Sequence, residues 1–196
     1  RQDAAQIDPS QLAGYLFNTT IAGIEKADAV LLVGTNPRTE AAIINARIRK
    51  TWLAKRIKIG VIGPQIDLNY PTKYLGAGPE TLQELAEGKG SFAEVLGKAQ
   101  NPMIILGAGA LRRADGLAIQ ALARKVATKY NMVKDGWNGY NMLHTAASRV
   151  GALMLGFVEG NEESWKKVDA LYLLGGDEMG VDHIRPDCFV VYQGHH

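Results

Sequence analysis

Five short apolar segments, each closed by a glycine, govern what this chain can fold into. Their hydrophobicity is continuous rather than alternating, which is typical of strands buried on both faces of a parallel sheet covered by helices. Helical patterns lie between them, so the sequence predicts an α/β fold with doubly wound, mainly parallel sheets. The predicted strands are residues 29–34, 57–63, 103–107, 171–175 and 189–194.

An amphipathic helix is predicted directly after the first strand. Asn36 can cap it, and Pro37 lies in its first turn, where a missing N–H costs nothing. Apolar residues then follow at spacings of three and four, up to Trp52. A second helix of this kind is predicted over residues 114–130, and shorter helices over 79–86, 91–98 and 141–155.

A repeated string suggests two similar units. Residues 26–34 (KADAVLLVG) match residues 167–175 (KVDALYLLG) in order and spacing. We therefore expect two Rossmann-like α/β units, one over residues 1–99 and the other over 100–196. The alternative is chance, because any buried strand entered from a charged turn has this pattern.

Charge and hydropathy narrow the range of partners. The chain has 22 Lys and Arg against 20 Asp and Glu, a balance that argues against nucleic acid as the main partner. No apolar run reaches the roughly 18 residues of a membrane span, so we expect no direct membrane insertion. The chain starts with Arg1 rather than Met, which indicates a piece of a longer protein.

One local cluster of basic residues stands out, at the end of the first predicted helix and in the turn that follows it. Trp52 is the only aromatic residue among them, so the pattern favours a solvated face or a subunit contact over a nucleic-acid site. The cluster consists of Arg47, Arg49, Lys50, Lys55, Arg56 and Lys58.

Cys188 is the only cysteine, which excludes an intrachain disulfide and suits a reducing compartment. An iron-sulfur cluster normally needs about four cysteine ligands, and a structural zinc ion about four Cys or His ligands. We therefore expect no metal site within this chain. Cys188 precedes a predicted buried strand and is expected in the core. His144, on an apolar stretch predicted to be helical, is expected to be structural.

Residues 34–38 (GTNPR) lie at the carboxyl end of the first predicted strand, where open α/β sheets bind ligands. The turn has neither the dinucleotide-binding nor the P-loop glycine spacing. Residues 107–113 begin as G-x-G, but Arg112 stands at the third glycine position, so a plain strand-to-helix turn is favoured. Arg38 opposes the dipole of the helix that it begins and therefore predicts an anionic partner.

Several separated strings resemble one family, the large iron-sulfur subunit of bacterial NADH-quinone oxidoreductase, respiratory complex I. Together they span nearly the whole chain. The strings are residues 17–24 (FNTTIAGI), 27–38 (ADAVLLVGTNPR), 42–50 (AIINARIRK), 74–79 (YLGAGP), 143–149 (LHTAASR) and 190–196 (VVYQGHH). His195 and His196 are then family residues rather than an affinity tag.

The resemblance implies a parent protein that transfers electrons from NADH to quinone with proton translocation. It implies the fold of molybdopterin oxidoreductases without their molybdenum cofactor, and 2Fe-2S and 4Fe-4S clusters only in an N-terminal part missing here. This chain is then a structural domain without cofactors. Its partners are other subunits of the peripheral arm, on the cytoplasmic side of the bacterial inner membrane.

Active molybdopterin enzymes hold their pterin dinucleotide at turns that resemble three turns of this chain. We expect these turns, which contain Gly34, Asn36, Arg38, Gly175, Asp177 and Gly194, to be vestigial, and we assign no catalytic residue. Asp177 and Glu178 form a possible acid-base pair, but helix caps are the commoner role for such residues. Two alternatives stay open. One is a segment that binds molybdopterin guanine dinucleotide, with Cys188 available to molybdenum, and the other is a nucleotide-binding regulatory module.

Overall fold

The computed structural model describes residues 5–157, 166–176, 182 and 184–194. The chain divides into two compact units, Ala5–Thr145 and a smaller one made of Arg1–Ala4 with Ala146–His196. The division that the sequence suggested, at residues 99 and 100, falls inside the larger unit. The physical reason is that β4 (Pro102–Gly107) pairs with every residue of β1 (Ala29–Val33), so both strands belong to one sheet.

The larger unit is built on a five-stranded sheet in the order β3-β2-β1-β4-β7. All four strand pairs are parallel, which confirms the predicted parallel α/β fold. The chain runs outward from β1 to β3 and then crosses back to β4, so the winding reverses between β1 and β4. The remaining strands are β2 (Lys58–Ile62), β3 (Lys73–Gly76), β7 (Tyr140–Leu143) and an antiparallel pair, β5 (Val133–Lys134) with β6 (Trp137–Asn138).

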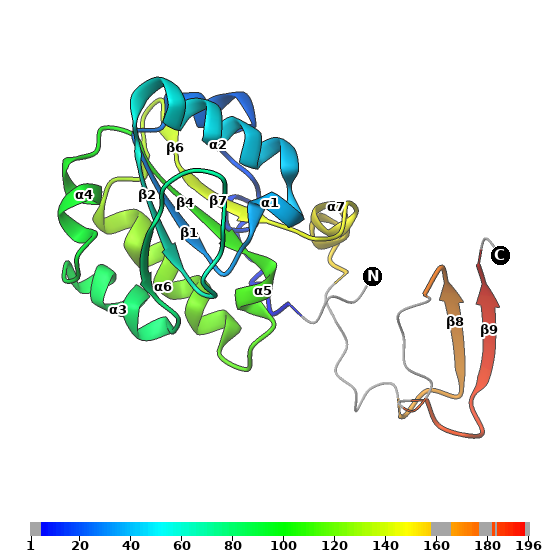
Figure 1. The fold of residues 1–196 in the computed structure, drawn as a ribbon. Coiled ribbons are helices and arrows are strands. Elements are labelled where there is room, and N and C mark those ends of the chain that lie inside the picture. The colour runs from blue at the N-terminus through cyan, green and yellow to red at the C-terminus, as the bar shows by residue number, and fades with distance from the viewer. Residues whose placement is uncertain (1–4, 158–165, 177–181, 183, 195–196) are drawn as a thin grey trace. The chain divides into compact units, whose positions relative to one another are not determined.

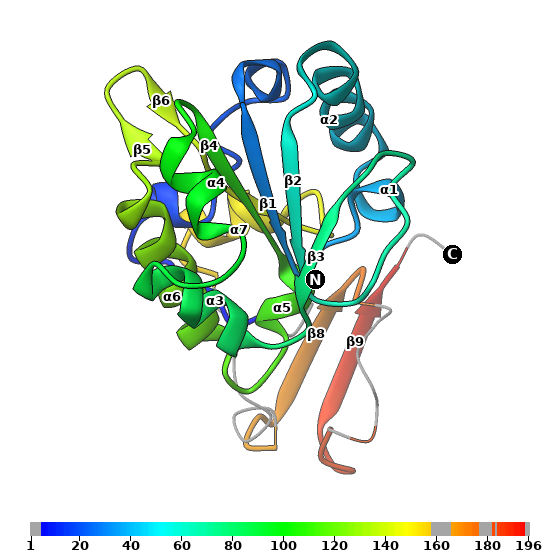
Figure 2. The same cartoon turned by 60° about the vertical axis from the view of Figure 1, so that its left-hand side comes forward.

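Helices cover both faces of this sheet (Figure 1). A second view shows α2 on one side of the strands and α3 with α6 on the other (Figure 2). The helix predicted after β1 is broken at Ala41, whose backbone is not helical, so two helices stand where one was expected. The helices are α1 (Pro37–Glu40), α2 (Ala42–Lys55), α3 (Pro79–Glu87), α4 (Ala93–Lys98), α5 (Ala108–Leu111) and α6 (Gly116–Lys129), with short 3-10 helices η1 (Leu12–Gly14) and η2 (Ala22–Lys26).

The core lies on both sides of β1, which is buried along its whole length. Val30 and Leu32 belong to a cluster that contains Ile44 and Ile48 of α2. Alternate side chains of a strand point to opposite faces, so Leu31 faces the layer of α3 and α6 instead. Burial on two faces explains why the strand is apolar throughout rather than alternating.

The helix predicted over residues 141–155 is wrong in its first part. Residues Tyr140–Leu143 form β7, which pairs with β4, and only Arg149–Met154 forms a helix, α7. Asn141 is fully buried, and its side chain donates to Thr19 Oγ1 (2.7 Å) and accepts from Thr19 N (2.8 Å). These distant contacts override the local helical pattern.

The smaller unit contains α7 and a parallel pair, β8 (Ala170–Leu174) and β9 (Phe189–Gln193), which confirms the last two predicted strands. Large apolar side chains on this pair are exposed, for example Leu174 (73%) and Phe189 (68%). Cys188 is half-buried rather than in a core, because no described layer of this unit covers the strand that it precedes. No helix among the described residues is long and apolar enough to cross a membrane.

Candidate functional site

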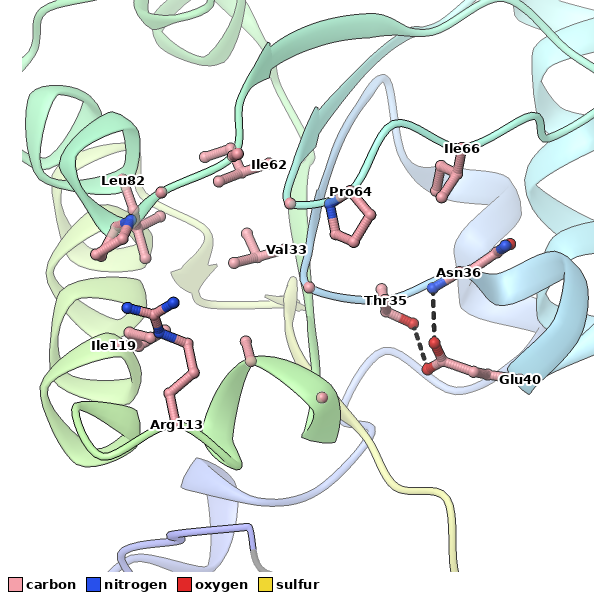
Figure 3. A pocket seen from close by; sticks show the side chains of 17 residues that line it. Val33, Thr35, Asn36, Glu40, Ile62, Pro64, Ile66, Leu82, Arg113 and Ile119 are labelled. Carbon is pink, nitrogen blue, oxygen red and sulfur yellow. Dashed lines mark hydrogen bonds between the residues drawn. The ribbon is translucent and has the colours of Figure 1, made fainter.

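A cavity of about 520 Å³ lies at the carboxyl ends of the strands of the larger unit, beside the point where the winding reverses. Its walls are mostly apolar and include Val33, Ile62 and Pro64. Figure 3 shows the two charged side chains of the cavity, Arg113 and Glu40, on opposite sides of these apolar residues. Ligands of open α/β sheets bind at this position. Which ligands this cavity can bind depends on whether the polar groups at its edges are already hydrogen-bonded or ion-paired within the chain.

Two glycines allow the ends of β1 and β4 to approach closely. Gly34 has a φ of +57°, and a Cβ atom there would lie 2.4 Å from the Cβ of Ala110. A Cβ atom on Gly107 would lie 2.4 Å from the carbonyl oxygen of Gly34. Both positions therefore require glycine, Gly107 because the ends of β1 and β4 are in contact and Gly34 because Ala110 of α5 lies against it. The G-x-G at residue 107 is the strand-to-helix turn that the sequence favoured, since β4 ends there and α5 begins.

The carboxylate of Glu40 lies at the turn after β1, where an anionic ligand would otherwise accept hydrogen bonds (Figure 3). Its Oε1 atom accepts a hydrogen bond from the backbone N–H of Asn36 (2.8 Å), and its Oε2 atom accepts one from the Thr35 hydroxyl (2.8 Å). Asn36 caps α1 as predicted, because its side chain accepts from the N–H of Arg38 (3.2 Å). The donors that a bound phosphate would use are thus directed at a carboxylate of the chain itself.

Arg38 has the negative partner that the helix dipole predicted. Its Nη1 atom lies 2.9 Å from Oδ2 of Asp67, in the segment after β2, and 3.3 Å from the Asp67 carbonyl oxygen. The side chains are 45% and 84% exposed, so the pair lies at the surface. The partner is a carboxylate of this chain.

Arg113 is also paired within the chain. Its Nε and Nη2 atoms donate to the two carboxylate oxygens of Asp115, at 2.7 and 3.0 Å. This hydrogen-bonded pair raises the pKa of Arg113 and lowers that of Asp115. The positive charge at the edge of the cavity is therefore balanced locally.

These residues do not fit the phosphates of a pterin dinucleotide. A phosphate at the turn after β1 would compete with Glu40 for the same donors and would face its negative charge. Neither Arg38 nor Arg113 is directed at such a ligand, since each binds a neighbouring aspartate. The cavity is therefore apolar, and the charged side chains at its two edges, Glu40 and Arg113, form their hydrogen bonds within the chain.

The other predicted site residues belong to the smaller unit. Gly175 follows β8 with a φ of +57°, and its N–H donates to Gln193 O (2.8 Å). Gly194 follows β9, so both glycines lie at the carboxyl ends of adjacent parallel strands. Asp177, with Glu178, lies outside the described residues.

His144 lies in the segment after β7 rather than in a helix, and its Nε2 atom is 2.7 Å from the carbonyl oxygen of Tyr15. This contact agrees with a structural role. Within the described part of the chain, no three His, Cys, Asp or Glu side chains are grouped so that they could hold a metal ion.

Fold and sequence together define the class of this protein. The sequence profile of the molybdopterin oxidoreductase family matches residues 1–196, so the chain belongs to that family. A solved structure, the formyltransferase/hydrolase complex of Methylorubrum extorquens, matches with a TM-score of 0.54 and 16% identity, over 92% of this chain and 61% of that one. At this identity the match supports the fold alone.

Nearer relatives are subunits of NADH dehydrogenases, which confirms the resemblance drawn from the sequence strings. The chain is 47% identical over 184 residues to the mitochondrial NADH dehydrogenase [ubiquinone] iron-sulfur protein 1 of Solanum tuberosum. It is 43% identical over 191 residues to a subunit of the NADH-quinone oxidoreductase of Rickettsia bellii. These matches cover 94% and 97% of this chain but only 25% and 28% of the relatives. The chain thus spans about a quarter of their length.

Proposed function

We propose that this chain is a non-catalytic structural region of the large iron-sulfur subunit of an NADH-quinone oxidoreductase. The observation that carries the proposal is the placement of Glu40, whose carboxylate binds Thr35 and Asn36 at the end of β1. Hydrogen bonds to charged groups contribute up to roughly 1.5–3 kcal/mol each, and a phosphate would have to replace both. The turn is stable without a ligand and unfavourable for an anionic one.

The rest of the proposal concerns the parent protein. Its 2Fe-2S and 4Fe-4S clusters lie in parts of the longer chain outside these residues, and electrons pass from NADH to quinone through those parts, with proton translocation. The present region supports them and contacts other subunits of the peripheral arm. That arm lies on the cytoplasmic side of the bacterial inner membrane. The names of the relatives, which are subunits of NADH dehydrogenases, support the assignment to such a parent complex.

The test uses the intact parent complex, purified with and without the Glu40→Gln substitution in this region. We expect both complexes to transfer electrons from NADH to quinone at the same rate. We also expect both to contain molybdenum and pterin far below one equivalent per complex. Stoichiometric molybdenum with a released pterin in the unmodified complex would overturn the proposal in favour of a cofactor-binding segment. Loss of electron transfer in Glu40→Gln, with the complex still assembled, would also contradict it.

A further inference from the structure

Five of the six residues in the basic cluster at the end of α2 fall into two groups with different partners, and the sixth, Arg49, is an exposed residue of α2. Arg47 and Lys50 both pair with the carboxylate of Glu25 in η2, Lys50 at 2.9 Å, and Lys55 donates to the carbonyl oxygen of Glu25. Hydrogen bonds from Lys50 and Arg47 lower the pKa of Glu25. These three cations therefore hold η2 against α2, and they are directed inward at their own chain.

Arg56 and Lys58, the last two residues of the cluster, are directed elsewhere. Arg56 ends α2 in the left-handed conformation, and its guanidinium carbon lies 4.6 Å from the ring centre of Trp52. This cation-π contact holds the guanidinium in a fixed place while the residue remains exposed. Lys58 is the first residue of β2 and is also exposed.

Both residues line a surface hollow of about 560 Å³ at the amino-terminal ends of β2 and β3. Lys73 of β3 adds a third cation, and Phe92, which is buried, lies at the base of the hollow. Lys73 donates to the carbonyl oxygen of Ser91 (3.0 Å), which is a neutral acceptor. No carboxylate lines this basic hollow, and none of its three cations forms an ion pair within the described residues.

We propose that the basic hollow binds an acidic segment of a neighbouring polypeptide in the assembly. Carboxylates of that segment pair with Arg56, Lys58 and Lys73, while an apolar side chain between them packs on Trp52. The inference rests on the proposed function, because it assumes that the chain works inside a multisubunit complex. It adds the position of one contact and the chemistry of the partner.

Several features favour a polypeptide over other anions. A small-molecule site encloses most of its ligand, whereas the three cations here are exposed around an open hollow. Nucleic acid requires a longer stripe of unpaired positive charge. Here Arg47 and Lys50 are already paired with Glu25, and the net charge of the chain is only +2. Arg and Trp are enriched among the residues that dominate binding energy in protein interfaces, and Lys at the rim contributes steering.

The first test places a photocrosslinking residue at position 58 of the intact parent complex, with position 125 as the matched control. Lys125 is an exposed lysine of α6, on the opposite face of the sheet from α2. We expect crosslinks from position 58 to one segment of another subunit that has net negative charge. Crosslinks to a neutral or basic segment, to nucleic acid or to lipid, or no crosslink in an assembled complex, would overturn the proposal.

The second test reverses the charge of two residues, Lys58→Glu with Lys73→Glu, and compares the variant with Lys125→Glu. We expect the double variant to weaken association of the subunit about tenfold at low salt, and the control to leave it unchanged. Equal assembly of both variants would show that the hollow is not an interface. A failure of the broader proposal looks different, because the unmodified complex would then contain stoichiometric molybdenum with a pterin.

Discussion

The guanidinium of Arg38 and the carboxylate of Asp67 lie 2.9 Å apart, Nη1 to Oδ2, and join the first turn of α1 to the segment after β2. A cation at a helix N-terminus opposes the macrodipole at a cost of about 0.3–1 kcal/mol. Asp67 offsets that cost from within the chain. The anionic partner of Arg38 is therefore a carboxylate of its own chain.

Substitution of either partner should have a small effect. Arg38→Ala and Asp67→Ala should each change the free energy of unfolding by less than about 1 kcal/mol, because the pair is exposed. Urea unfolding of both single variants and the double variant measures the coupling between them. A coupling energy of zero would show that the ion pair does not offset the cost of a cation at the start of α1.

Gly34→Ala should be among the more damaging single-methyl changes in the larger unit. It adds a backbone cost of about 1–2 kcal/mol for a left-handed residue, and a clash with Ala110 that costs roughly 1–3 kcal/mol more. Gly136→Ala is the matched control, since Gly136 also has a positive φ (+71°) but open space around it. The midpoint of thermal unfolding should be much lower for Gly34→Ala than for Gly136→Ala, and equal midpoints would contradict the close contact of Gly34 with Ala110 of α5.

Glu40→Gln should weaken the turn after β1 and remove the charge that repels anions. Both hydrogen bonds lose their charged acceptor, and the amide nitrogen of glutamine cannot accept one of them, so we expect a loss of about 1 kcal/mol in the free energy of unfolding. Pyrophosphate, used as a probe in calorimetry, should bind the variant more tightly than the unmodified chain. Equal binding by the two proteins would mean that Glu40 does not govern access to these donors.

The ionised carboxylate of Asp8 should make the free energy of unfolding of the larger unit fall at low pH. Hydrogen bonds from Ser10 and from Arg124 lower the pKa of Asp8 from 3.8 to about 2. Because the folded pKa lies below the unfolded one, the stabilisation is complete above pH 4 and is lost as the pH falls toward 2. Unfolding midpoints of the unmodified chain and Asp8→Asn should differ at pH 6 and converge near pH 2. Asp135→Asn, an exposed aspartate without an ion pair in the described residues, is the control.

The parts of the fold that the sequence predicted best depend on local patterns. Strands such as β1 and β4 are buried on both faces, so their sequences are apolar at every position. That continuous pattern can be recognised from the sequence alone. The cap at Asn36 and the charged partner of Arg38 also follow from local rules.

The errors occurred where distant residues decide the structure. The pattern around Asn141 is helical in isolation, but hydrogen bonds with Thr19 and pairing with β4 make it a strand. The boundary predicted at residues 99 and 100 falls inside one sheet, because the order of the strands, which pairs β4 with β1, cannot be read from the local sequence of either strand. Glu40 was not among the predicted site residues, although an acidic residue one turn beyond an Asn cap was the available signal.

The carboxylate of Glu40 also changes how folding of this unit responds to its surroundings. A site that depends on a free ligand gains stability by mass action, in proportion to the logarithm of the ligand concentration. Glu40 is tethered four residues from the amide that it binds, so its local concentration is fixed at synthesis. The turn after β1 can therefore form on a newly made chain whether or not the cell has supplied any cofactor.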